Sequence, residues 1–183
     1  KANQAMIKRL HWAHQIKISD RLSALDALKL DQLMYWRVEG TQAQIIEISG
    51  LSVEKLSKLI VNIELYQQLN SIQQQAISAI HLKQSQVMAL MQGDLITGKR
   101  YIAACHDLVS MKQAQKMGCD AILLSPVLAT ETHPEARALG WEQFKNLAAQ
   151  VEIPVFALGG MQTGDLLTAQ QQGAYGVAGI RFL

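Results

Sequence analysis

Two glycines, Gly159 and Gly160, directly follow an apolar run over residues 154–158. A run of this kind is typical of a strand that helices cover on both faces. Glycines at its carboxyl end let backbone N–H groups approach an anion, because no Cβ stands in the way. The pair predicts either a phosphate-binding turn or an ordinary tight turn between a strand and a helix, and alone it leaves both open.

Gly179, Ile180 and Arg181 end the last apolar run of the chain and form a second candidate anion contact. Gly179 and Ile180 need to supply only backbone N–H groups there. Arg181 could add a charge-assisted hydrogen bond to a phosphate. The alternative for Arg181 is a surface arginine near the end of the chain.

Two histidines are candidates for proton transfer, because the histidine side chain titrates near neutral pH. His106 comes directly after an apolar run, where it could act on a substrate or orient the turn at Asp107. His133 lies in a polar loop over residues 127–140, where it could act as a general acid/base or be a solvated loop histidine. We predict both as catalytic candidates.

Ser125 and His81 stand at the ends of two further apolar runs. Ser125 could contact a substrate, or its hydroxyl could bond to the backbone before Pro126. We interpret His81 as an interior histidine that hydrogen bonds satisfy.

Composition limits the classes of function. With 183 residues and 49% apolar content, the chain can form one sizeable core. Its 17 basic and 15 acidic residues give a charge of +2, which argues against binding to nucleic acid or an anionic membrane. Cys105 and Cys119 show no C-x-x-C spacing, which indicates no zinc site and a reducing, cytoplasmic environment. No apolar run reaches the ~18 residues of a membrane span.

Eight short apolar runs predict strands, over residues 14–20, 44–49, 64–70, 79–82, 101–105, 119–126, 154–158 and 175–180. Helical patterns are expected over residues 22–40, 53–63, 85–91, 108–117 and 141–150, with Asp107 as an N-cap and Gly118 as a helix end. This alternation favours parallel strands joined by right-handed crossovers.

Eight such units predict an α/β protein with a (β/α)8 TIM barrel, compact because such barrels typically have about 250 residues. We assign residues 14–183 to the barrel and residues 1–13 to a linker or lead-in helix. A doubly wound open sheet is the alternative, but no G-x-G-x-x-G motif follows the first predicted strand. In a barrel, Gly159, Gly160 and Gly179 would meet at the carboxyl ends of strands seven and eight, where a phosphate is often held.

Several segments at the ends of these strands resemble one family, the thiamine-phosphate synthases and their relative, the TenI-type thiazole tautomerase. They are His81-Leu82, Cys105-His106-Asp107, Leu124-Ser125-Pro126-Val127, the loop from Thr130 to Trp141, the run over residues 154–160 and the run over residues 173–180. The resemblance is closest over residues 101–180. The chain is similar in particular to the version fused behind a Nudix hydrolase domain.

The resemblance implies that a synthase holds a pyrophosphate with Mg²⁺, an Arg and a Lys after strand two, Asn and Asp after strand three, and a Lys after strand six. The predicted strand two ends in Glu47-Ile48-Ser49 without a basic residue, and Asn70 is the candidate after strand three. His133 stands where the Lys is expected. The sequence therefore predicts degenerate pyrophosphate and Mg²⁺ sites, with Mg²⁺ needed only if synthase activity is retained.

We therefore expect a synthase-like or TenI-like domain of thiamine biosynthesis or salvage that binds a thiazole phosphate or thiamine phosphate. The alternative is a non-catalytic phosphate-binding module attached to a Nudix pyrophosphohydrolase domain. A homodimer is a further expectation, and no metal ligand is predicted among the residues.

Overall fold

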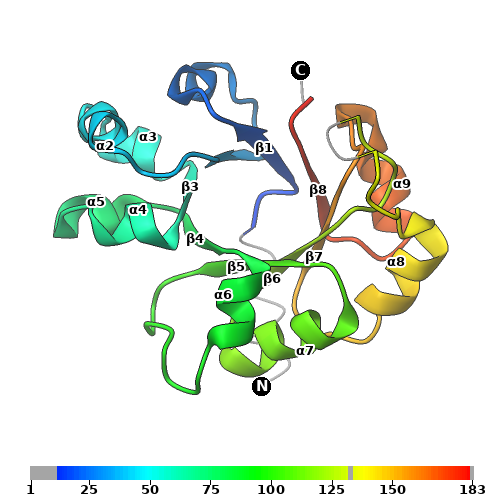
Figure 1. The fold of residues 1–183 in the computed structure, drawn as a ribbon. Coiled ribbons are helices and arrows are strands. Elements are labelled where there is room, and N and C mark those ends of the chain that lie inside the picture. The colour runs from blue at the N-terminus through cyan, green and yellow to red at the C-terminus, as the bar shows by residue number, and fades with distance from the viewer. Residues whose placement is uncertain (1–11, 132–133, 182–183) are drawn as a thin grey trace.

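The computed structural model describes residues 12–131 and 134–181, which form a closed barrel of parallel strands (Figure 1). The strands are β1 (Gln15–Ser19), β2 (Gln32–Trp36), β3 (Leu59–Asn62), β4 (Ala79–Leu82), β5 (Tyr101–Cys105), β6 (Ala121–Leu124), β7 (Val155–Leu158) and β8 (Gly176–Gly179). Each strand pairs with the next along the chain, and β8 pairs with β1 to close the ring. The prediction of a (β/α)8 barrel is confirmed.

Short helices surround the barrel, as Figure 1 shows. They are the 3-10 helices η1 (Leu22–Ala27) and η2 (Thr163–Asp165), with α2 (Gln42–Ser49), α3 (Val53–Leu56), α4 (Ile63–Gln67), α5 (Ser71–Ala76), α6 (Gln84–Ala89), α7 (Leu108–Met117), α8 (Gly140–Ala148) and α9 (Leu166–Gln171). Helices of one to three turns let a chain of 183 residues complete the eight units. Within the described residues, no helix has the length and apolar character to cross a membrane.

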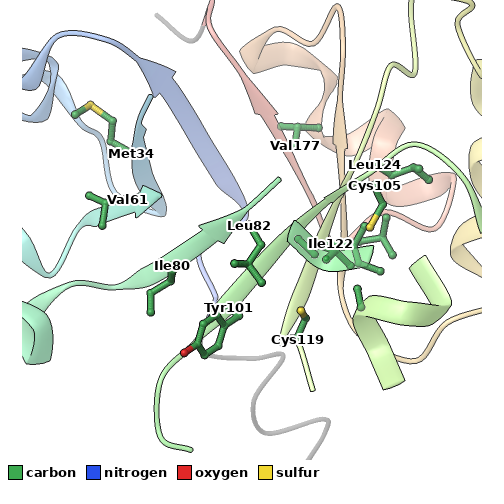
Figure 2. Packing of buried hydrophobic residues seen from close by; sticks show 14 of the residues in the cluster. Met34, Val61, Ile80, Leu82, Tyr101, Cys105, Cys119, Ile122, Leu124 and Val177 are labelled. Carbon is green, nitrogen blue, oxygen red and sulfur yellow. The ribbon is translucent and has the colours of Figure 1, made fainter. Parts of the chain in front are cut away.

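Side chains alternate between two layers of core along each strand. Residues such as Ile16, Tyr35 and Phe156 fill the inside of the barrel. Their sequence neighbours pack outward against the helices, where Cys105, Ile122 and Leu124 lie close together (Figure 2). Both faces of the strands are thus buried, which explains why they read as continuous apolar runs.

The floor of the barrel, at the amino ends of the strands, is filled by aromatic rings. Trp12 meets Phe156 edge to face at 6.1 Å between ring centroids, and the Arg100 guanidinium lies 5.3 Å from the Trp12 ring. The hydroxyl of Tyr175 donates to the Trp12 carbonyl. Apart from Trp12 and Ala13, the predicted linker of residues 1–13 lies outside the described residues.

The helix predicted over residues 22–40 is wrong. Only η1 forms there, and the chain then turns at Asp31, with a φ of 66°, into β2. Four of the five β2 residues are buried, with aromatic side chains at Tyr35 and Trp36. Burial on both faces of the barrel wall outweighs the helical spacing of the leucines.

The strands predicted over residues 44–49 and 64–70 are also wrong, because the first segment lies within α2 and the second begins within α4, which ends at Gln67. Thr41 and Gln44 form a capping box that starts α2, in which Ile46 is 65% exposed. Asn62 caps α4 by accepting from the Leu65 N–H at 2.8 Å. The helix predicted over 53–63 ends after one turn and gives way to β3, a fully buried strand.

Beyond residue 79, the predicted elements agree with the structure. Asp107 caps α7 by accepting from the Ser110 N–H at 2.8 Å, and Gly118 ends this helix with a φ of 99°. The hydrogen bonds from Ser110 lower the pKa of the Asp107 carboxyl. This cap fixes the start of α7 directly beside His106.

Candidate active site at the carboxyl ends of the strands

A cavity of about 730 Å³ opens at the carboxyl ends of the strands. It is lined by Arg37, His106, Ser125, Pro126, Ala129, Thr130, Glu131, Ala136, Arg137, Leu139, Leu158, Gly159, Gly160, Met161, Gln162, Gly179, Ile180 and Arg181. All the residues predicted to contact a phosphate or substrate, except Asn70, therefore line this one cavity. The catalytic candidate His106 lines it as well. Three arginines against one glutamate give this lining a positive charge, which suits an anionic ligand.

Gly159 and Gly160 form one wall of the cavity directly after β7, with φ angles of 113° and 70°. A Cβ on Gly159 would lie 2.8 Å from the Val127 nitrogen, and one on Gly160 would lie 2.9 Å from the Leu128 Cβ. Both residues must be glycine because of the backbone angle and because the loop after β6 packs onto them. That loop is held by two backbone bonds, from Val127 N–H to the Leu158 oxygen and from Leu128 N–H to the Gly159 oxygen.

Arg181 lies shortly after β8 and lines the cavity. Its guanidinium lies 2.5 Å from the Glu131 carboxylate, in the loop that follows β6. Both side chains are exposed, at 62% for Arg181 and 81% for Glu131. Arg181 is therefore ion-paired with the loop in this structure and would have to exchange this partner to contact a phosphate.

His106 and Ser125 form the proton-transfer candidates of the cavity. The His106 Nδ1 lies 2.9 Å from the Ser125 carbonyl oxygen and 3.3 Å from its hydroxyl oxygen. A carbonyl oxygen only accepts hydrogen bonds, so Nδ1 carries the proton in the neutral ring and Nε2 is left as the base. The Gln84 side chain accepts from the His106 N–H at 2.8 Å and fixes the backbone.

Arg37 is a site residue that sequence reasoning missed. It is the first residue after β2 and lines the cavity, so a basic residue does follow strand two, contrary to expectation. The error came from placing strand two at residues 44–49. Arg137, in the loop after β6, lines the cavity as well and was also missed. The sequence signal for Arg37 was its position directly after the run Gln32–Trp36.

Asn70 lies apart from the other predicted site residues. It does not end a strand, because its side chain caps α5 by accepting from the Gln73 N–H at 2.8 Å. Strand three ends at Asn62, whose side chain donates to the Val38 oxygen at 2.5 Å and caps α4. His133 lies outside the described residues.

His81 is an interior histidine, as expected, but one of its nitrogens is not satisfied. The ring is 7% exposed and stacks on Tyr35 at 4.3 Å between centroids. Its Nδ1 has no hydrogen-bond partner among the described residues. Burial, followed by the positive charges of Lys83 and Arg37, lowers the pKa of His81 to about 4. The ring is therefore neutral at physiological pH.

A family model and individual relatives of known sequence match this chain and agree on one family. The family model described as thiamine monophosphate synthase matches residues 29–183. The chain is 44% identical over 77 residues to "Putative thiamine-phosphate synthase 2" of Aquifex aeolicus, covering 42% of this chain and 41% of the relative. It is 29% identical over 100 residues to the thiamine-phosphate synthase of Chloroflexus aurantiacus, covering 54% of this chain and 46% of the relative. The chain thus spans less than half the length of these curated relatives.

Among solved structures, the fold is similar to that of the thiamine phosphate pyrophosphorylase from Pyrococcus furiosus. The TM-score is 0.63, with 17% sequence identity over 94% of this chain and 86% of the other. At this identity the likeness shows a common barrel fold.

Proposed function

The chain belongs to the thiamine monophosphate synthase family, and from this membership we propose that its cavity binds a thiazole phosphate and transfers a proton on the thiazole, as a TenI-type tautomerase does. The phosphate would lie against Gly159, Gly160, Gly179 and Ile180. His106 would act as the general acid/base. The reaction would serve thiamine biosynthesis or salvage.

The observation that carries this proposal is the pair formed by His106 and Ser125 within the same cavity as the glycines. A tautomerisation needs one group that removes a proton and returns it elsewhere on the ring. The hydrogen bond from Nδ1 to the Ser125 carbonyl orients the imidazole and leaves Nε2 to accept the proton. A backbone cradle and one oriented histidine are sufficient for this chemistry.

The synthase reaction is the second candidate, and the position of Arg37 favours it. An arginine directly after β2 is one of the groups that the family resemblance implies for the pyrophosphate. Against it stands the residue after Asn62, which is Ile63 rather than an acid. The attached Nudix domain, the homodimer and the cytoplasmic location expected from the sequence remain proposals.

The test is proton exchange on a thiazole phosphate, followed by NMR in D₂O. We expect His106→Gln to lower the exchange rate by about 10²–10⁴-fold while binding of the thiazole phosphate, measured by calorimetry, changes little. Lys116→Gln, an exposed change on α7 outside the cavity lining, should leave both unchanged.

Three other outcomes would change the assignment. An unaltered exchange rate in His106→Gln would remove the proposed acid/base. Thiamine phosphate formed from both synthase substrates would support the transferase instead. Binding without any exchange in the unaltered protein would favour the non-catalytic module.

A further inference from the structure

The family resemblance implies a Mg²⁺ ion at the mouth of the barrel, which requires side chains there that can coordinate it. Mg²⁺ needs oxygen ligands in near-octahedral geometry and is usually held through one or two carboxylates. At the mouth these should come from residues that follow the strands. The fit therefore depends on which oxygen donors stand after β3 and β4 and around the cavity.

The donors after β3 do not fit. Asn62 uses both ends of its amide within the fold, donating to the Val38 oxygen and accepting from the Leu65 N–H. The next residue is Ile63, which has no oxygen to offer from its side chain. The strand end that should hold the ion is thus occupied by a structural amide and an apolar side chain.

The cavity lining offers no free carboxylate among the described residues to replace the missing acid after β3. Glu131 is the acidic residue of the described lining, and it pairs with Arg181. Across residues 12–131 and 134–181, no group of three or more His, Cys, Asp or Glu side chains could hold a metal ion. The described lining therefore offers Mg²⁺ a single carboxylate, and that carboxylate already pairs with Arg181.

Positively charged residues directly follow two strands on one side of the barrel, β2 and β4. Arg37 follows β2 and Lys83 follows β4, and neither forms an ion pair with a described residue. The buried ring of His81 in β4 stacks on Tyr35 of β2, and its pKa is lowered by burial and then by the charges of Lys83 and Arg37. The two cations thus follow strands that the stacked rings of Tyr35 and His81 connect, and no described carboxylate pairs with either of them.

We infer that this chain binds the anionic group of its ligand at the β2–β4 side of the mouth without a divalent metal, with Arg37 and Lys83 supplying the positive charge. The class of ligand is a pyrophosphate or a second phosphate. The inference rests on the proposed function only in taking the ligand to be phosphorylated. The inferred binding mode differs from the metal-dependent binding that the family resemblance implies.

The probe is inorganic pyrophosphate, titrated into the full chain by calorimetry in EDTA and again with excess MgCl₂. We expect binding in EDTA, with no gain in affinity when Mg²⁺ is added. Lys83→Gln and Arg37→Gln should each weaken binding by about tenfold, as expected for loss of a charge-assisted contact. Lys116→Gln is the matched control and should bind like the unaltered protein.

An affinity that rises tenfold or more with Mg²⁺, or no binding in EDTA, would overturn the inference. Unchanged binding in Lys83→Gln would also contradict it. Circular dichroism of each variant shows that a loss of binding is not a loss of folding. The thiazole phosphate assay is independent, so proton exchange can fail while metal-free pyrophosphate binding stands, or the reverse.

Discussion

The two sides of the barrel mouth offer a ligand different kinds of contact. On the side of β6, β7 and β8, part of the wall is backbone, shaped by Gly159 and Gly160 and by the loop that packs on them, and this part is called the backbone wall. On the side of β2, β3 and β4, Arg37 and Lys83 directly follow β2 and β4, and His81 is buried in β4; these side chains are called the side-chain wall. A backbone wall depends on a few glycines, whereas a side-chain wall depends on which residue follows each strand.

The largest expected effect comes from breaking the backbone wall. Gly159→Ala places a Cβ 2.8 Å from the Val127 nitrogen at a φ of 113°. Backbone strain of this kind costs about 1–3 kcal/mol, and the clash adds to it. We expect a loss of several kcal/mol in the free energy of unfolding by urea, together with loss of thiazole phosphate binding.

Gly164→Ala is the control for this change. Gly164 lies in the next turn, has no atom within 4 Å of a built Cβ and does not require a positive φ. It should change the free energy of unfolding by less than about 1 kcal/mol. If Gly159→Ala proves equally mild, the backbone wall is more tolerant than its contacts indicate.

The second effect concerns the side-chain wall and depends on pH. The pKa of His81 falls from 6.5 to about 4 on folding, so the unfolded chain binds this proton more readily. The stabilisation is complete above pH 6.5 and is lost as the pH falls towards 4, by up to about 3 kcal/mol. His81→Phe keeps a ring on Tyr35 and should remove this part of the pH dependence of urea unfolding.

A pH dependence in His81→Phe equal to that of the unaltered protein would show that other groups cause it. Comparing the two proteins at each pH separates His81 from the carboxylates, which titrate in both.

The smallest effect is expected from an exposed ion pair on the side of β6, β7 and β8, which links the loop after β6 to the end of β8. Glu131 and Arg181 lie 2.5 Å apart but are largely solvated, and such pairs contribute about 0–1 kcal/mol. A double-mutant cycle with Glu131→Gln and Arg181→Gln should therefore give a coupling energy below about 1 kcal/mol that decreases with added salt. A coupling of several kcal/mol would mean that the loop is fastened far more firmly than its exposure indicates.

The contrast between the two walls also explains which parts of the site could be predicted from the sequence. The turn at Gly159 and Gly160 was predicted because the two glycines end a short apolar run, and the start of α7 was predicted because Asp107 caps a helix of standard length. In these places the local pattern and the tertiary environment favour the same structure. The residue types therefore indicated both the element and its end.

The side-chain wall was not predicted, because local patterns there conflict with the fold. Ile45, Ile46 and Ile48 suggest a strand, but the capping box at Thr41 starts a helix that buries Ile48 alone among its residues. Leucine spacing likewise concealed β2 and so displaced Arg37 from the expected site. Counting eight strands gave the right barrel even though two of them were misplaced, since the number of units does not depend on their boundaries.

Closure of the barrel has a consequence for folding. Residues 15–17 pair with residues 177–179, so the ring is completed only when segments at opposite ends of the sequence meet. Contacts of such long sequence separation slow folding, because the chain must lose much of its freedom before they form. Gly179 belongs to this seam, and Ile180 directly follows it. Pairing of β1 with β8 therefore closes the sheet and at the same time fixes a strand end that lines the cavity.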